Sequence, residues 1–241
     1  MKMIKKIVGI ILNSIDYKEN HKISYVLTES GKISVLIPRA KRYKEGLIAD
    51  TQSLNLVEFE IDEPKSLSKA KNINVIDYFN EIKNDLKRYS VASYALELIY
   101  RMIEDDINPS LLFKLLNEFL KELKVRDNIK LLLLQFRIKM LYFLGIQPNF
   151  KECIHCGKKE ELAGLSIKYG AMECVSHISG GNIGMNATNI IKLLYLDKTL
   201  QIKINDENVI DYISNIIDTY YESHQYYGLK SIKMLKELKC Y

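Results

Sequence analysis

The first part of the chain, to about residue 76, alternates apolar and polar side chains with the period of two that is typical of β-strands. Turn residues such as Glu29-Ser30-Gly31 separate the alternating segments. The predicted strands are 7–12, 22–27, 32–37, 57–61 and 67–75. Five short strands within about seventy residues predict a small closed barrel of the OB type, with an SH3-like barrel as the alternative.

From about residue 75 onward, apolar side chains recur every three or four positions, which is the period of an amphipathic helix. The first stripe covers 79–103 and predicts one long helix. A second helix is expected to begin at Pro109, since proline is favoured in the first helical turn. The segment 129–144 is apolar nearly all round, which predicts the central helix of a bundle, with Gly145 as its C-cap.

The last sixty residues or so predict two or three further helices, at 190–197, 209–220 and 229–238. Asp206 is the expected N-cap of the middle one. The glycine-rich segment 179–184 has some likeness to a phosphate-binding loop. It lacks the Gly-Lys-Ser/Thr ending and a strand-to-helix context, so we interpret it as a linker.

Three of the four cysteines lie close together in the sequence. Cys153 and Cys156 form a C-x-x-C pair, and Cys174 and His177 form a C-x-x-H pair. A two-residue gap lets one tight turn aim both side chains at a single ion, and four such ligands suit tetrahedral zinc. The spacer, with a turn at Gly170, predicts a strand and hairpin that bring the second pair back to the first. This pattern predicts one structural zinc ion; the alternative is a pair of knuckles that no longer binds metal.

A short basic loop is expected between the third and fourth strands. Its candidate nucleic-acid contacts are Arg39, Lys41, Arg42, Tyr43 and Lys44. On an OB barrel such a loop flanks the oligonucleotide face, where cations neutralise phosphates and aromatic rings stack on bases. The alternative is a charged loop that only faces solvent.

Composition and charge are those of an ordinary globular protein. The 241 residues are 47% hydrophobic and 27% charged, and the formal net charge is +5. The first fifty residues hold ten Lys or Arg against five acids, so the basic part is the N-terminal fifth. The N-terminal apolar run is too short for a signal peptide, and no run reaches the ~18 residues of a membrane span. We therefore expect a cytoplasmic protein without membrane contact, whose reduced thiols favour metal over disulfides.

No pattern in the sequence indicates an enzyme. The metalloprotease, serine hydrolase and nucleotide-binding signatures are all missing. A zinc deaminase would need a glutamate two residues after a metal ligand and an open coordination position. His21 and His224 are isolated, and His155 is expected to be a solvent-facing turn residue.

Several local segments, in their order and spacing, resemble the RecO family of bacterial DNA repair and recombination mediators. These segments are 9–12, 17–20, 27–32, 39–44, 144–148, 153–157, His224 and 229–231. The resemblance covers essentially the whole chain. Two departures stand out: Pro38-Arg39-Ala40 replaces the usual glycine before the basic residues, and His177 stands where the family more often has cysteine.

The resemblance implies an α+β protein, with a five-stranded OB-fold barrel followed by an all-helical bundle that carries an inserted zinc knuckle. The expected domains are 1–77, 78–150, 151–182 and 183–241. The implied activity is binding single- and double-stranded DNA and annealing complementary strands. With RecR, such a protein also helps to load RecA onto DNA coated by single-strand-binding protein, whose acidic C-terminal tail it captures.

By position, the resemblance implies phosphate contacts at Arg39, Lys41, Arg42 and Lys44, and zinc ligation by the two knuckles. It implies a cytoplasmic, nucleoid-associated protein that is not an enzyme. Two other functions remain open from the residues alone. One is a zinc-dependent enzyme that processes nucleic acid, and the other is a protein-binding adaptor without DNA contact.

Overall fold

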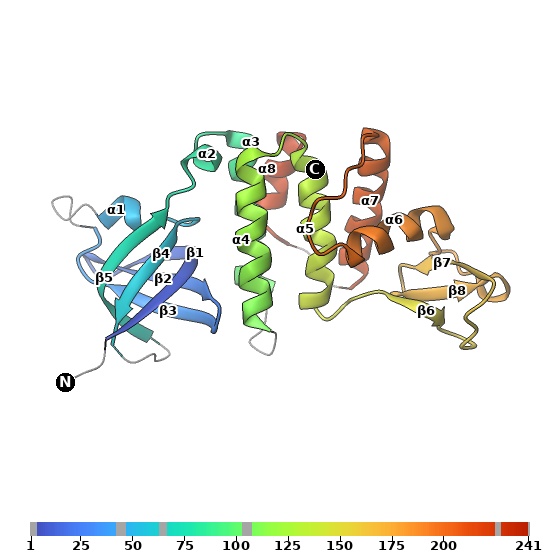
Figure 1. Cartoon of the computed structure of the whole chain (residues 1–241), viewed down its shortest axis with the longest axis horizontal. Coiled ribbons are helices and arrows are strands. Elements are labelled where there is room, and N and C mark those ends of the chain that lie inside the picture. Colours follow the sequence, from blue (N-terminus) through green and yellow to red (C-terminus); the bar gives the residue numbers. More distant parts are fainter. Residues whose placement is uncertain (1–3, 42–46, 63–66, 103–107, 225–227, 241) are drawn as a thin grey trace. The chain divides into compact units, whose positions relative to one another are not determined.

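The computed structural model describes residues 4–41, 47–62, 67–102, 108–224 and 228–240 (Figure 1). The chain forms two compact units. The first is Met1–Arg126 with Ser231–Glu237, and the second is Asp127–Lys230 with Leu238–Tyr241. The domain boundaries that the sequence suggests after residues 77, 150 and 182 stay a prediction.

The first unit contains the five-stranded barrel that the sequence predicts, drawn in blue to teal in Figure 1. Its strands are β1 (Lys5–Tyr17), β2 (His21–Thr28), β3 (Gly31–Ile37), β4 (Leu56–Ile61) and β5 (Leu67–Asp77). They close in the order β1-β2-β3-β5-β4, with β3 and β5 parallel and the other pairs antiparallel. A short helix, α1 (Leu47–Asp50), lies between β3 and β4. This connectivity confirms the OB-type barrel.

Strand β1 is longer than its apolar run because its polar second half continues to pair with β2, as far as Tyr17 opposite His21. Within the run, Ile10, Ile11 and Leu12 are all buried. Ile11 belongs to the barrel core, while α3 and α4 contact the outside of β1. Burial on both faces explains why Ile10, Ile11 and Leu12 are continuously apolar and do not alternate, whereas Val8 earlier in the run is 40% exposed.

The remaining elements of the first unit are helices. They are α2 (Asn80–Lys83), α3 (Leu86–Met102), α4 (Pro109–Val125) and α8 (Ser231–Glu237). Helix α8 packs on α3, where the backbone N–H and hydroxyl of Ser231 both donate to Glu97 Oε2, at 2.9 and 2.7 Å. A segment near the end of the chain thereby completes the N-terminal unit.

The prediction of one long helix over 79–103 was wrong. The chain breaks between α2 and α3, where Asp85 Oδ1 accepts the backbone N–H groups of Lys87 and Arg88 at 2.9 and 3.0 Å. A side-chain cap of this kind begins a new helix. The buried face shifts accordingly, so that Leu86 and Tyr89 of the predicted stripe are 61% and 40% exposed.

The second unit contains α5 (Ile129–Phe143), α6 (Gly184–Leu196), α7 (Glu207–Ser223) and the strands β6 (Asn149–Cys153), β7 (Leu162–Ser166) and β8 (Ala171–Cys174). As predicted, α5 is buried nearly all round, and it packs on α6 and α7. Its C-cap is Leu144 and not Gly145 as predicted; Gly145 follows the cap with φ +71°. Asp206 caps α7 through the N–H of Asn208, also as predicted.

A buried ion pair ties two helices of this second unit. Arg137 of α5 is 2% exposed and pairs with Asp218 of α7, while Tyr221 donates its hydroxyl to the Arg137 carbonyl at 2.8 Å. A charge buried this deeply is tolerated only with such a partner. No helix in the described parts of the chain is long and apolar enough to cross a membrane.

We predict that Gly9→Ala destabilises the barrel. A Cβ atom on this β1 residue would collide with Val26 Cγ1 and lie 2.7 Å from the Leu27 carbonyl oxygen, so backbone would have to move. We expect a loss of about 1–3 kcal/mol in the free energy of unfolding, the usual cost of overpacking, measured by urea denaturation. The control is Gly180→Ala, where a Cβ meets no atom within 4 Å. Equal stability of the two variants would contradict this prediction.

Candidate functional site

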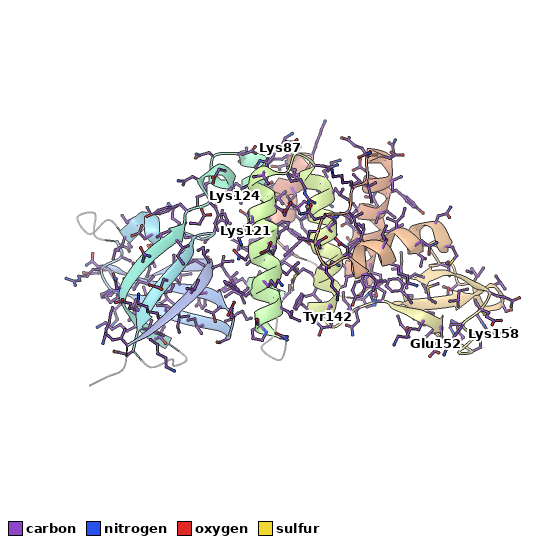
Figure 2. All side chains as sticks on the ribbon, in the orientation of Figure 1. Lys87, Lys121, Lys124, Tyr142, Glu152 and Lys158 are labelled. Atoms are coloured by element: carbon purple, nitrogen blue, oxygen red, sulfur yellow. The ribbon has the colours of Figure 1, made fainter. Side chains whose placement is uncertain are left out.

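The first knuckle forms where strand β6 ends. Cys153 is the last residue of the strand, and its carbonyl accepts the N–H of Gly157 at 2.8 Å across a tight turn. Gly157 has φ +71°, a conformation that glycine adopts without strain. The turn leaves Cys156 exposed beside the buried Cys153. The side chains of Glu152 and Lys158 extend from this part of the unit (Figure 2).

The second knuckle forms at the end of strand β8. A hairpin that turns at Gly170 joins β7 to β8, as the spacer predicts, and Cys174 is the last residue of β8. A single turn of 3-10 helix, Val175–His177, then places the imidazole next to Cys174. Strands β6 and β8 are parallel neighbours, so their ends, and the two knuckles, lie at the same edge of the sheet.

The four predicted ligands come together. The sulfur and nitrogen atoms of Cys153, Cys156, Cys174 and His177 all lie within 4.8 Å of one another. Cys156 Sγ lies 3.8 Å from Cys174 Sγ, and His177 Nδ1 lies 3.2 Å from Cys174 Sγ and 3.9 Å from Cys153 Sγ. Tetrahedral zinc, with bonds of about 2.3 Å to sulfur and about 2.0 Å to nitrogen, requires ligand separations of about 3.8 and 3.5 Å. The cluster could therefore hold a metal ion, and its donor set fits zinc.

The environment also favours a thiolate at Cys153. Burial opposes ionisation, but hydrogen bonds from the backbone amides of His155, Cys174 and Cys156 outweigh it and lower the pKa of the Cys153 thiol to about 6. The thiolate is the form that binds metals. Backbone amides that point at a cysteine sulfur are common in metal knuckles, because the tight turn that places the ligand side chains also directs the amides toward the sulfur.

A buried carboxylate supports the cluster, and our sequence interpretation missed it. Glu173, which is fully buried, accepts hydrogen bonds from Ser179 N and Oγ, both at 3.1 Å, and from Asn182 Nδ2 at 3.0 Å. His155 Nε2 lies 3.4 Å from its other oxygen. His155 is an exposed turn residue, as predicted, and this contact holds its ring beside the carboxylate. Burial opposes ionisation, but the hydrogen bonds from Asn182 and Ser179 outweigh it and lower the pKa of Glu173.

The hairpin tip also packs against helix α7. A Cβ atom on Gly170 would lie 2.5 Å from the Tyr220 hydroxyl oxygen, so only glycine fits there. Tyr220 donates its hydroxyl to the Ile146 carbonyl at 2.9 Å, and the ring of His224 stacks on Tyr220 with centroids 4.4 Å apart. His224 is thus a packing residue of the second unit.

The basic loop begins beside the β1–β2 turn of the barrel. Arg39 has φ +58°, and its N–H donates to His21 Nδ1 at 3.0 Å, which gives His21 a role in fixing the loop. Lys41 is anchored through its N–H to the Asn20 carbonyl, and its ammonium pairs with Asp16 at 2.7 Å. Arg42, Tyr43 and Lys44 lie outside the described residues.

A closed OB-type barrel, helices and a cluster of three cysteines and a histidine define an OB-barrel protein with a Cys₃His cluster that could hold a metal ion. Comparison with models of protein families then identifies the family to which this OB-barrel protein belongs. The family model described as "Recombination protein O N terminal" matches residues 1–79, and the one described as "Recombination protein O C terminal" matches residues 83–233. The chain belongs to the RecO family of DNA repair proteins.

Curated relatives agree with this assignment over nearly the full chain. The chain is similar to proteins named "DNA repair protein RecO" from Halalkalibacterium halodurans (29% identity, 98% of this chain and 96% of the relative), Clostridium novyi (28%, 98% and 95%) and Exiguobacterium (26%, 98% and 97%). These names describe a DNA repair protein and specify no reaction.

We predict that the purified protein binds one zinc ion per chain and that Cys156→Ser weakens this binding at least tenfold. The serine hydroxyl is a poor ligand, whereas the exposed position of Cys156 keeps the folding cost of the change small. Metal content and competition with a chromogenic chelator measure the effect. Cys240→Ala is the matched control, because Cys240 is outside the cluster. An unchanged zinc affinity in Cys156→Ser would rule out this ligand set.

Proposed function

We propose that this RecO-family chain is a recombination mediator in DNA repair. It binds single- and double-stranded DNA, anneals complementary strands and, together with RecR, helps to load RecA onto DNA coated by single-strand-binding protein. The observation that carries the proposal is family membership over nearly the whole chain, combined with an OB-type barrel on which the basic loop begins beside the β1–β2 turn.

The basic loop supplies the DNA contacts in this proposal. Arg39, Lys41, Arg42 and Lys44 contact phosphates, and Tyr43 stacks on a base. Two hydrogen bonds support it because they fix the start of the loop to the barrel: the Arg39 N–H donates to the His21 side chain, and the Lys41 N–H donates to the Asn20 carbonyl. The Lys41–Asp16 pair is largely exposed, and exposed pairs contribute little free energy, so a DNA phosphate can replace the carboxylate.

The metal site has a structural role in this proposal. Cys153, Cys156, Cys174 and His177 bind one zinc ion, which provides folding free energy by joining the ends of β6 and β8. Four protein ligands leave no open coordination position for a substrate or a water molecule. The chain is therefore a binding and annealing protein without an enzymatic step, and it acts in the cytoplasm on the nucleoid.

We predict that Arg39, Lys41, Arg42 and Lys44 dominate the electrostatic part of DNA binding. Changing all four to alanine should flatten the plot of log affinity against log salt for single-stranded DNA. Each lost phosphate contact lowers the slope by about 0.7. The measurement is fluorescence anisotropy of a labelled oligonucleotide across a range of salt concentrations.

The matched control removes four exposed lysines of the second unit, Lys168, Lys192, Lys198 and Lys203. It changes the net charge by the same amount, so it should leave the slope nearly unchanged. If the two variants behave alike, DNA binding follows net charge and the loop is ordinary surface. If the native protein binds no DNA, the adaptor function becomes the better explanation.

We also predict direct binding to RecR and to the acidic C-terminal tail of single-strand-binding protein. Purified partners and a synthetic tail peptide allow both affinities to be measured by calorimetry. A peptide without its acidic residues is the control for the tail and should bind at least tenfold more weakly. A protein that binds DNA but neither partner would be an annealing protein and not a loading mediator.

A further inference from the structure

A polar cavity of about 390 Å³ opens in the first unit, on the barrel side of the α2–α3 break. Its volume lies in the usual range of small-molecule sites. Hydroxyl, amide and amine groups dominate its lining, which consists of Ser14, Lys22, Thr51, Gln52, Ser53, Lys83 and Tyr89. Among the described residues that line it, none is acidic. This lining suits an anion with several oxygen atoms.

Lys83 is the central cation of the cavity. Its ammonium donates to Asn55 Oδ1, and the amide of Asn55 is itself fixed to the carbonyls of Ala49 and Asp50 at 2.8 and 2.9 Å. Among the described residues no carboxylate oxygen lies within ion-pair distance of Lys83; the nearby Asp77 pairs with Lys124 at 3.0 Å. Burial lowers the pKa of Lys83, and the charge of Asp77 offsets only part of this effect. A partly buried ammonium without a direct ion pair, whose charge Asp77 balances only from a distance, favours an anionic ligand.

The second cation connects the cavity to the basic loop. Lys22 lies opposite Asp16 in the β1–β2 pairing, and Asp16 holds the ammonium of Lys41 at 2.7 Å. The hydrogen bond from Lys41 lowers the pKa of Asp16; burial opposes this shift, and the charges of Lys41 and Lys22 add to it. One carboxylate thus lies between the cation of the cavity and the cation of the loop. A strand bound at the loop would reach the cavity along this line of charges.

The rim of the cavity is apolar. Tyr89 is 40% exposed, and Leu86, one helical turn earlier on the same face of α3, is 61% exposed. Inside the cavity, the hydroxyls of Ser14 and Thr51 already donate to backbone carbonyls. Gln52, Ser53 and the two ammonium groups are the other polar groups of the lining that a ligand could contact. Cations inside and an aromatic ring at the rim are the two features of a nucleotide subsite.

We propose that this cavity binds one nucleotide of a single strand, with the phosphate on Lys22 and Lys83 and the base on Tyr89. The proposal rests on the proposed function, since it gives the bound strand a second contact beyond the loop. The phosphate could be an internal phosphodiester or a 5′-terminal phosphate, and the experiment below separates the two. An acidic peptide would satisfy the ammonium groups but leave Tyr89 unused.

The test uses the full chain and a thymidine trinucleotide, which is short enough to occupy the cavity without the loop. Calorimetry at fixed ionic strength gives its affinity for the native protein and for Lys83→Gln. We expect Lys83→Gln to weaken binding at least tenfold and Lys83→Arg to restore most of it. The control is Lys87→Gln, an exposed lysine of the first turn of α3 outside the lining (Figure 2), which should change the affinity less than twofold.

Three further ligands identify the group that is bound. If only the 5′-phosphorylated trinucleotide binds, the site takes a strand end; equal binding of the 5′-hydroxyl form indicates an internal phosphodiester. Tyr89→Ala should weaken either trinucleotide at least threefold and leave inorganic phosphate unaffected. A tetra-aspartate peptide or inorganic phosphate that binds as tightly as the trinucleotide would overturn the proposal, as would equal effects of Lys83→Gln and Lys87→Gln.

The outcome separates this inference from the proposed function. If long single strands bind through the loop while Lys83→Gln behaves like the control, the cavity proposal fails and the mediator function stands. If long strands do not bind but the trinucleotide binds in a Lys83-dependent way, the mediator function fails and the cavity remains a nucleotide site. Asp16→Asn provides an independent check. Removing this carboxylate frees Lys41 of the loop and Lys22 of the cavity, so a long strand should bind more tightly.

Discussion

Charges that are withdrawn from water need a partner, and this constraint organises both units of the protein. In the second unit, Glu173 is satisfied by the hydrogen bonds of Ser179 and Asn182, and Arg137 is satisfied by Asp218. The three thiols and the imidazole of the metal cluster are crowded donors that a cation would hold together. In the first unit, Lys83 lacks an ion-pair partner in the described part of the chain, and there the constraint indicates a ligand.

The Cys₃His cluster and the basic loop differ in how the backbone holds their side chains, and this difference agrees with the functions proposed for them. Both knuckles of the metal cluster sit on strand ends, where the backbone fixes the direction of each ligand, as a structural ion requires. The start of the basic loop is fixed through His21 and Asn20, and Lys41 pairs with the exposed carboxylate of Asp16. Such weak pairs allow cations to exchange one anion for another, which is what the proposed binding and release of DNA strands would require.

Much of the fold could be predicted from local pattern. Period-two alternation identified the barrel strands, and the spacing of Cys153, Cys156, Cys174 and His177 predicted a cluster that the structure brings together. The break at Asp85 escaped prediction, because the apolar stripe continues through it and only a side-chain cap marks the boundary. Glu173 was missed because nothing in a short strand tells a buried acid from a solvent-facing one. The cavity was not predictable either, since its lining comes from segments far apart in the sequence.

The packing of α8 on α3 has a consequence for how the protein is made. Ser231 contacts Glu97 across a stretch that contains all of the second unit except Leu238–Tyr241, so the first unit is not contiguous in sequence. On the ribosome, the barrel and α3 emerge long before their last partner does. The surface of α3 that binds α8 therefore stays uncovered until residues 127–230 have been synthesised. The order of translation thus makes completion of the barrel unit a late event, and a chain that stops early lacks that final contact.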